Sequence, residues 1–232
     1  MAAVKRRIEN ERMLGRVFVL LLSFAAAYAG WDSRWMLPLR VLMTLFHEFG
    51  HASAALLTGG SVDQILIHPQ GGGLCFVRGG WRWLVLPAGY LGSMSAGCAI
   101  ILLACRTSYD RFVSLSLGCL LILATLIYVR TRGGLIYGVS VGIALASAGW
   151  WLPEEINDLL LCLIGAMNCM ASLLGLKYLF TYKGYSDALL FSKEIIPLPP
   201  VVWAVSWALL SAACLYFTLR AALRPVSNAS KP

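Results

Sequence analysis

Residues 36–58, MLPLRVLMTLFHEFGHASAALLT, contain the sequence His47-Glu48-Phe49-Gly50-His51 inside an otherwise apolar run. A run of this length can cross a bilayer as a helix. On a helix, His47 and His51 lie four residues apart on one face, so both can reach one zinc ion, and Glu48 lies beside them as the base for an attacking water. The stretch therefore predicts a helix at 36–58 that carries a hydrolytic zinc site within the membrane.

This HExxH pattern uses two of the three histidines in the chain. The alternative is that its side chains only form hydrogen bonds within a helix bundle. That alternative leaves Glu48 without a partner at membrane depth, where an acidic side chain costs about 2.5–3.5 kcal/mol on insertion scales. A metal ion supplies the partner, so we predict one bound Zn²⁺.

Hydrophobic residues make up 59% of the 232-residue chain and charged residues only 13%, whereas a soluble domain carries about 25% charged residues. We therefore predict an all-α polytopic membrane protein, embedded in a lipid bilayer, with six to seven transmembrane helices and a short membrane-associated β-hairpin after the HExxH helix. The net charge of +8 comes from residues in loops and at helix ends, which favours topology signals over nucleic acid binding. The predicted spans are about 16–31, 36–58, 81–105, 111–130, 134–151, 156–180 and 198–219.

The first span has an alternative interpretation. Lys5-Arg6-Arg7, a short apolar run and Ala27-Tyr28-Ala29 together resemble a signal peptide with its cleavage site. Glu9 and Glu11 in the preceding region argue against that interpretation, and we expect a retained first helix.

Lysine and arginine positions predict the orientation. With the first span crossing and the second returning, the N-terminal side collects Lys5, Arg6, Arg7, Arg12, Arg16, Arg78, Arg82, Arg130, Arg132, Lys177, Lys183 and Lys193. The other side collects Arg34, Arg40, Arg106, Arg111, Arg220, Arg224 and Lys231. The larger first group predicts a cytoplasmic N-terminus and an HExxH helix that runs inward, with its motif from the middle toward the cytoplasmic half.

A hairpin is predicted at 61–78. Residues 62–67 and 74–77 are short β-prone runs, and His68-Pro69-Gln70-Gly71-Gly72-Gly73 between them supplies turn chemistry. The hairpin is apolar enough to lie against or dip into the membrane. Its edge can pair with an extended substrate; the alternative is a loop that only packs.

The next predicted helix, 81–105, contains Gly89, Ser93 and Gly97 at four-residue spacing. Small residues on one face let another helix approach closely, and we expect the HExxH helix to be that neighbour. A second ladder, Gly134, Gly138 and Gly142, is expected only to pack helices.

Zinc needs a third protein ligand. Asp187, flanked by mostly apolar residues at the start of the last helical region (184–219), can complete a His-His-Asp site; its alternative is a helix-start acid. His68, on the predicted turn, is a second candidate ligand or a substrate-facing residue. Asn168, in the middle of a predicted helix, either bonds a neighbouring helix or faces the cavity as a donor to substrate or oxyanion.

These motifs resemble the M50B-like branch of the site-2 protease (M50) family of intramembrane zinc metallopeptidases. The resemblance covers about residues 40–210 and rests on His47 to His51, Pro69 to Gly73, Pro87 to Gly92, Ser186 to Ala188 and Ile195 to Trp203. Gly89 and Ser93 look like the Gly-x-x-x-small motif of the family. In better-known members the third ligand lies in a Leu-Asp-Gly sequence, whereas Ala188 follows Asp187 here.

The resemblance implies a single transmembrane peptidase domain, 1–232, that cleaves transmembrane segments of membrane-protein substrates in regulated intramembrane proteolysis. Compact size favours a bacterial plasma membrane. No pattern specifies an oligomeric state. Two rivals remain: a catalytically inactive membrane scaffold or binding protein that retains the metal site, and a metal-ion carrier. The carrier would need ion-pathway acids in several helices.

Overall fold

The computed structural model describes residues 2–178 and 186–223, with the side chains of residues 14–176 and 186–223. Lys183, Arg224, Lys231 and the first two residues of the predicted third-ligand region lie outside the described residues, as do the side chains of Lys5, Arg6, Arg7, Arg12 and Lys177. The chain forms α1 (Ala2–Gly30), a short 3-10 turn η1 (Arg34–Met36), α2 (Leu37–Leu57), β1 (Ser61–Ile67), β2 (Gly73–Arg78), α3 (Arg82–Val85), α4 (Ala88–Arg106), α5 (Asp110–Tyr128), α6 (Arg132–Trp151), α7 (Glu154–Tyr178), α8 (Asp187–Glu194) and α9 (Pro200–Ala222).

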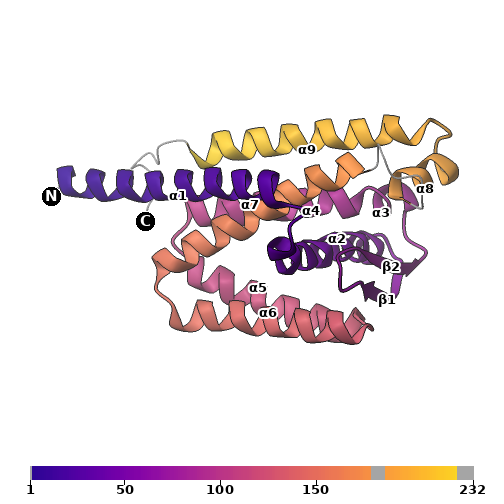
Figure 1. Ribbon diagram of the computed structural model, residues 1–232, viewed down its shortest axis with the longest axis horizontal. Coiled ribbons are helices and arrows are strands. Elements are labelled where there is room, and N and C mark those ends of the chain that lie inside the picture. The colour runs from indigo at the N-terminus through magenta and orange to yellow at the C-terminus, as the bar shows by residue number, and fades with distance from the viewer. Residues whose placement is uncertain (1, 179–185, 224–232) are drawn as a thin grey trace.

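Helices α1, α5, α6, α7 and α9 run along the long axis of the molecule, and the two strands, α3 and α8 gather at one end of it (Figure 1). We call this end the cavity end. Helix α4 packs against α2, α7 and α9, while α5 pairs with α6. The apolar core lies between these helices and includes the fully buried Leu45, Ile101 and Leu161. The structure confirms the predicted polytopic all-α class with one small hairpin.

Five helices are long and apolar enough to cross a membrane, namely α4, α5, α6, α7 and α9, and residues 14–30 of α1 form a shorter apolar helix. Large apolar side chains such as Leu120, Ile136 and Leu209 are more than half exposed, as expected for helices that face lipid. The chain is therefore an integral multi-pass membrane protein. Helix α2 is not among the five candidate spans.

Both ends of α2 lie in the cavity half of the bundle. At its start, the carbonyl of Pro38 accepts a hydrogen bond from the Tyr137 hydroxyl. Tyr137 lies about 9 Å along α6 from Thr131, and Thr131 is at the cavity end, where its hydroxyl accepts from the Ile67 amide of β1. At its end, Thr58 accepts from the backbone amide of Trp81. A helix with both ends in one half does not run the length of the bundle, so the structure differs from the end-to-end crossing predicted for residues 36–58.

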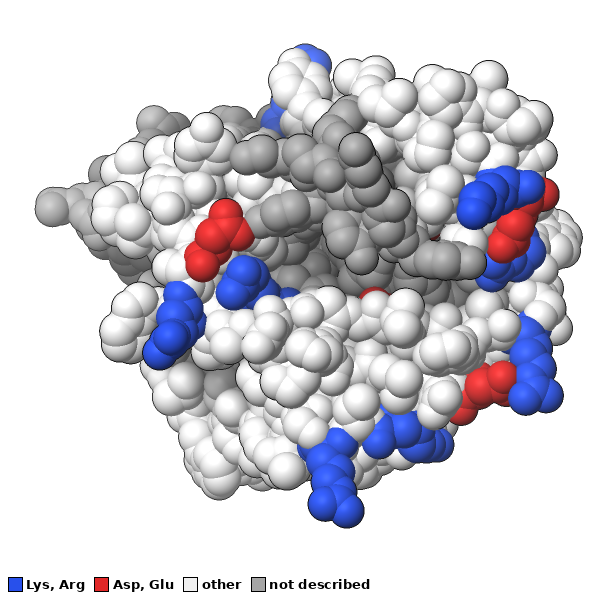
Figure 2. Space-filling model, turned by 45° about the vertical axis from the view of Figure 1, so that its right-hand side comes forward, with Lys and Arg blue, Asp and Glu red and all other residues white. Residues whose placement is uncertain are grey.

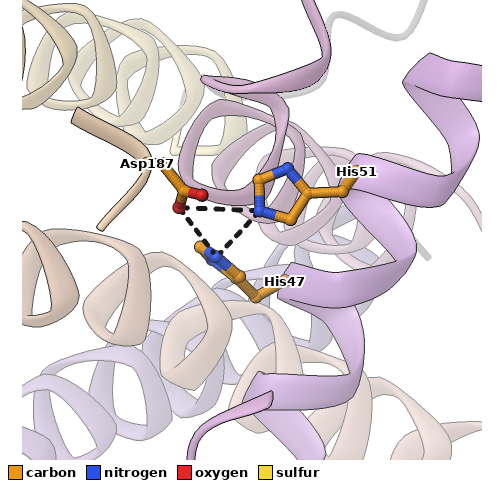
Figure 3. A group of neighbouring side chains, drawn as sticks. All are labelled: His47, His51 and Asp187. Carbon is orange, nitrogen blue, oxygen red and sulfur yellow. Dashed lines mark hydrogen bonds and ion pairs between the residues drawn. The ribbon is translucent and has the colours of Figure 1, made fainter. Parts of the chain in front are cut away.

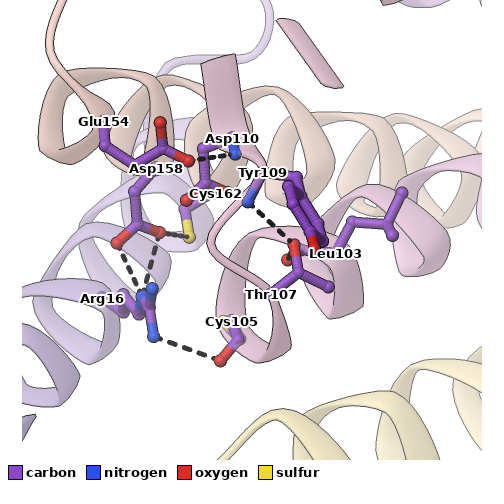
Figure 4. Close-up of polar contacts among 9 residues, drawn as sticks. All are labelled: Arg16, Leu103, Cys105, Thr107, Tyr109, Asp110, Glu154, Asp158 and Cys162. Atoms are coloured by element: carbon purple, nitrogen blue, oxygen red, sulfur yellow. Dashed lines mark hydrogen bonds and ion pairs between the residues drawn. The ribbon is translucent and has the colours of Figure 1, made fainter. Parts of the chain in front are cut away.

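The predicted grouping of basic residues fails for the same reason. Arg16 donates to the carbonyl of Cys105 at 3.1 Å and to both carboxylate oxygens of Asp158 at 2.9 and 2.7 Å (Figure 4). Cys105 lies about 26 Å along α4 from the cavity end. Arg16 thus lies beside Arg106, which the grouping put on the opposite side, because one crossing rather than two separates Arg16 from the hairpin.

The hairpin matches the prediction. Strands β1 and β2 are antiparallel, with Ile65 opposite Cys75 and Ile67 opposite Gly73, and a register shift between Val62 and Gln64. The turn is closed by a bond from the His68 amide to the Gly72 carbonyl, 2.9 Å. The predicted helix at 81–105 is interrupted at Pro87, which separates α3 from α4, because proline lacks an amide hydrogen and its ring clashes with the preceding turn.

The glycine faces pack helices as predicted. A Cβ on Gly50 would lie 2.3 Å from the Ala88 carbonyl, and one on Gly92 would lie 3.2 Å from the Cα of Gly50, so α2 and α4 touch backbone to backbone. Gly97 differs from the prediction, because its Cβ would meet Gly165 and Cys169 of α7 instead of α2. In the second ladder Gly138 and Gly142 pack α6 on α5, whereas Gly134 differs from the prediction, because its Cβ would lie 2.9 Å from Ile67 of β1.

Candidate metal centre

Helix α2 presents His47 and His51 from adjacent turns, with their Nε2 atoms 3.2 Å apart. The Nδ1 of His51 donates a hydrogen bond to the Val85 carbonyl of α3 at 2.7 Å. This bond fixes the ring orientation and leaves the Nε2 lone pair free to bind a metal, which is the usual arrangement of a metal-ligating histidine. The ring of Tyr90 on α4 lies edge-on to His47, with centroids 4.6 Å apart, and limits how far that imidazole can turn.

Asp187 reaches the two histidines from α8, which begins at this residue and is capped by the Ser186 side chain accepting from the Leu189 amide. Its Oδ2 lies 3.4 Å from His47 Nε2 and 3.5 Å from His51 Nε2 (Figure 3). Asp187 is therefore a helix-start acid and also the third member of the group. The structure brings together the three residues that the sequence analysis proposed as ligands.

The three donor atoms fit one small metal ion. With ligand bonds of 2.0–2.1 Å, two corners of a zinc tetrahedron lie about 3.3–3.4 Å apart. The observed separations of 3.2, 3.4 and 3.5 Å are close to this edge. Two neutral imidazoles and a carboxylate also make up a donor set that suits a divalent transition metal. Among the described residues, this is the group of His, Cys, Asp and Glu side chains whose ligand atoms converge in this way.

Helix α8 is held in place from two directions. Arg82 on α3 makes a two-bond ion pair with Glu194, at 2.8 and 2.9 Å. This pair holds the pKa of Glu194 below its ordinary value, chiefly through the hydrogen bonds from Arg82. On the other side, Phe191 packs against Trp203 and Trp207 of α9. These contacts fix the position of Asp187 through the backbone of its helix.

Glu48 is 4% exposed and lies next to the triad on α2. Its carboxylate lies against Gly73, where a Cβ would come within 2.7 Å of Oε1, and the backbone of Cys75 interacts with it. Gly73 is thus small because Glu48 occupies the space that a side chain would need. The sequence showed only a run of three glycines, and the contact with Glu48 explains why one of them cannot be replaced freely.

A cavity of about 620 Å³ contains the triad and Glu48, and its volume lies in the range of small-molecule and peptide pockets. The surface seen from the cavity end is hollowed at its centre and is mostly uncharged (Figure 2). One wall is α2, from Arg40 to His51, and the facing wall is the turn and β2, from Gln70 to Val77. The cavity therefore runs along both the metal-site helix and one edge of the hairpin.

The remaining predicted site residues have other places. His68 is exposed on the turn, and its Nδ1 accepts from the Gln70 amide at 3.3 Å, away from the triad. Asn168 is fully buried and donates to the Ser93 carbonyl of α4 at 2.9 Å, which is the interhelical one of its two predicted roles. The Ser93 hydroxyl donates to the Gly89 carbonyl at 2.6 Å. Gly89 faces the histidines, because a Cβ there would lie 2.4 Å from both imidazoles.

The comparisons with known proteins agree with this site. A family described as Peptidase M50B-like matches residues 20–218, which is most of the chain and includes α2, the hairpin and α8. Neither the curated proteins nor the solved structures gave a match.

Proposed function

Because the chain belongs to the Peptidase M50B-like family, we propose that it is an intramembrane zinc endopeptidase that hydrolyses peptide bonds in or near transmembrane segments of membrane proteins. His47, His51 and Asp187 would hold the zinc ion, and Glu48 would be the catalytic acid-base. The observation that carries the proposal is the convergence of three ligand atoms at separations of 3.2–3.5 Å on the wall of a cavity. The three residues line the cavity, so that an ion held by them would be reached from it, as catalytic zinc sites require.

Zinc, when bound, supplies a Lewis acid that polarises the scissile carbonyl and acidifies the attacking water. Glu48 lines the same cavity and is positioned to accept a proton from that water. The same carboxyl group then delivers the proton to the nitrogen of the leaving amine. Gly73 leaves room for the carboxylate at the cavity wall, and the backbone of Cys75 interacts with it there, so that little reorganisation is needed between the two transfers.

A transmembrane substrate must unwind before cleavage, because a helix uses its carbonyl groups in its own hydrogen bonds. The hairpin supports a way to hold the unwound chain. The outer edge of β1 is covered by the α5–α6 connection, with Arg130 N donating to Ile65 O at 3.0 Å and Ile67 N donating to Thr131 Oγ1 at 3.1 Å. The outer edge of β2 faces the cavity. A substrate segment that adds to β2 as a strand would pass beside Glu48.

The proposal is tested with purified protein and a fluorescently labelled transmembrane substrate in lipid nanodiscs. Glu48→Gln should lower kcat/KM by about 10²–10⁴-fold, the usual contribution of a general base, and should retain one zinc per chain. Glu155→Gln, the same change on an exposed residue at the start of α7, is the matched control and should retain activity. Zinc binding with no cleavage by the unaltered protein would favour the inactive scaffold and overturn the proposal.

We further propose that the membrane is a bacterial plasma membrane and that the N-terminus is cytoplasmic, supported by the basic run Lys5-Arg6-Arg7. The structure adds that the turn of the hairpin lies at the opposite end from Arg16. Cysteines introduced one at a time at Ser108 and Gln70, in a background with Cys75, Cys119 and Cys214 replaced by Ser so that no exposed or partly exposed native cysteine is left among the described residues, should react with a membrane-impermeant maleimide from opposite faces. Ser108 should share its face with an N-terminal tag. Equal labelling of both positions from one face would contradict this topology.

A further inference from the structure

We propose that Arg40 binds an acidic side chain of the substrate, located about three residues from the scissile bond. The inference rests on the proposed function and deepens it, because it names a class of substrate sequence. It makes Arg40 a residue that determines specificity, whereas the triad and Glu48 carry the chemistry.

Arg40 lines the cavity and has an unused donor. Its Nε is fully buried and has no hydrogen-bond partner among the described residues. Its Nη1 lies 4.0 Å from Asp32, at the limit of an ion pair, and the Asp32 side chain is 82% exposed. A guanidinium without a close acceptor is costly, and the Arg40 side chain is still 23% exposed on the cavity wall, so an anion in the cavity would find a favourable position at its accessible part.

The second arginine on the described part of the cavity wall provides the contrast. Arg82 uses Nε and Nη2 in its two-bond pair with Glu194, at 2.8 and 2.9 Å. Its charge is therefore already neutralised by a residue of the same chain. In the described part of the chain, the nearest carboxylate to Arg40 is that of Asp32 at 4.0 Å, and the planar guanidinium is suited to a two-bond pair with an incoming carboxylate.

The geometry of α2 gives the distance from Arg40 to the reacting bond. Arg40, Thr44 and His47 lie on one face of α2, and seven residues of helix span about 10 Å. The turn and β2 lie alongside this stretch, because Gly72 donates to Thr44 Oγ1 at 3.3 Å and a Cβ on Gly73 would lie 2.7 Å from Glu48 Oε1. Three residues of strand also span about 10 Å. A substrate strand along β2 would therefore place its third residue from the scissile bond at Arg40.

The experiment uses one labelled transmembrane substrate with Glu placed in turn at each of five positions on both sides of its cleavage site, and with Gln at the same positions as reference. For the unaltered enzyme, Glu at about the third position on one side should raise kcat/KM at least about tenfold over Gln, as expected for a charge-assisted hydrogen bond. Arg40→Gln should reduce this ratio to about one. Arg40→Glu should instead prefer Lys at that position, and Arg40→Lys should keep part of the preference for Glu.

Two controls separate this inference from the proposed function. Arg34→Gln removes the same charge from an exposed arginine near the start of α2 and should keep the Glu preference. In the Glu48→Gln background, fluorescence anisotropy measures binding of the uncleaved Glu and Gln substrates, so the preference has a readout independent of catalysis.

If the enzyme cleaves Glu and Gln substrates equally at every position, or if Arg40→Gln keeps the preference, the inference is wrong while the proposed function stands. If Arg40→Gln affects all substrates alike and the effect disappears in nanodiscs without anionic lipid, Arg40 binds a lipid phosphate instead, and the inference is likewise overturned. If no substrate is cleaved, the proposed function fails, and binding without a Glu preference then rejects the inference as well.

Discussion

At the cavity end of the bundle, His47, His51 and Asp187 direct three ligand atoms toward one point (Figure 3). At the opposite end, Arg16 and Asp158 direct opposite charges toward each other, at 2.7 and 2.9 Å (Figure 4). Both groups lie in an apolar bundle, where unpaired charge is costly. Among the described residues, the close ion-pair partners of Asp187 are the two imidazoles, and the group lines a cavity. The second is neutralised by its own residues.

A structural polar cluster and a functional one differ in whether their polar groups find partners within the chain. In the Arg16 group the interactions are complete within the chain, as the added bond from Arg16 to the Cys105 carbonyl illustrates. In the His-His-Asp group the donors are complete only when an ion is added. The Arg16–Asp158 group should therefore govern stability and the His-His-Asp group metal binding. Four predictions test that separation.

Asp187→Asn should cause the largest effect. The amide removes the negatively charged ligand. Loss of a residue that only hydrogen-bonds to a metal ligand lowers metal affinity by about 10–100-fold, so loss of the ligand itself should lower zinc affinity by more than this and reduce cleavage accordingly. Competition with a chromogenic chelator measures the affinity. Undiminished zinc binding would reject Asp187 as a ligand and return attention to His68.

Gly89→Ala should disrupt the same site without removing a ligand. The added methyl group would lie 2.4 Å from atoms of both imidazoles, and a displacement of about 1 Å at a catalytic group can cost about 10²-fold in rate. Cleavage rate and zinc content are measured together. Gly133→Ala, whose methyl group would meet only Pro69 at 3.9 Å, is the control; equal effects of the two variants would contradict the assignment.

Arg16→Met should affect stability more than zinc binding. It leaves the largely buried Asp158 carboxylate without its arginine partner. The free energy of unfolding should fall by about 3 kcal/mol, the lower end of the range for breaking a buried ion pair. Unfolding by SDS in mixed micelles measures the loss. Replacing both residues, with Arg16→Met and Asp158→Leu, should recover most of it. Loss of zinc from the folded single variant would show that the two ends are not separable.

Glu194→Gln should have the smallest effect, since a partly exposed pair contributes about 0.2–1 kcal/mol. The pKa of Glu194 is lowered by Arg82 in the folded protein, so the pair stabilises fully above the ordinary Glu value of 4.5 and this contribution is lost as the pH falls through the lowered folded value. Unaltered protein and Glu194→Gln should therefore differ in thermal stability at pH 7 and converge in acid. A constant difference at all pH values would contradict the assignment.

The sequence was sufficient for the elements that depend on local patterns. The apolar runs predicted α2, α5, α6, α7 and α9 to within a few residues, whereas α1 begins at Ala2 instead of residue 16 and the span 81–105 is interrupted at Pro87. The β-prone runs on either side of the Pro-Gln-Gly-Gly-Gly turn predicted both strands. His47 and His51 could be paired because an i, i+4 spacing on a helix fixes their relative positions. Asp187 could only be proposed, since nothing local relates it to a histidine 136 residues earlier.

Sequence reasoning failed for one segment that has the apolar composition of a spanning helix but does not run the length of the bundle. Residues 36–58 are apolar enough to suggest a crossing, yet α2 starts and ends in the cavity half. The count of basic residues then assigned Arg16 and Arg106 to opposite ends of the bundle, although they lie at the same end. One additional crossing in the count exchanges the two ends for every loop that follows it. The contacts of Tyr90 and the Val85 carbonyl with the histidines were also missed, since no motif marks a side chain or backbone group that acts through a neighbour in space.

By itself, the sequence determined that this protein is a membrane helix bundle with a hairpin and that one helix carries two imidazoles and a carboxylate on adjacent turns. Hydropathy and helical periodicity are properties of neighbouring residues, so they can be read along the chain. Only the tertiary structure decided that α8 brings Asp187 to within 3.5 Å of both histidines, that Glu48 occupies the space beside Gly73, and that Arg16 and the hairpin lie at opposite ends. Those relations come from helix packing and long-range ion pairs, which depend on distances that no local pattern encodes.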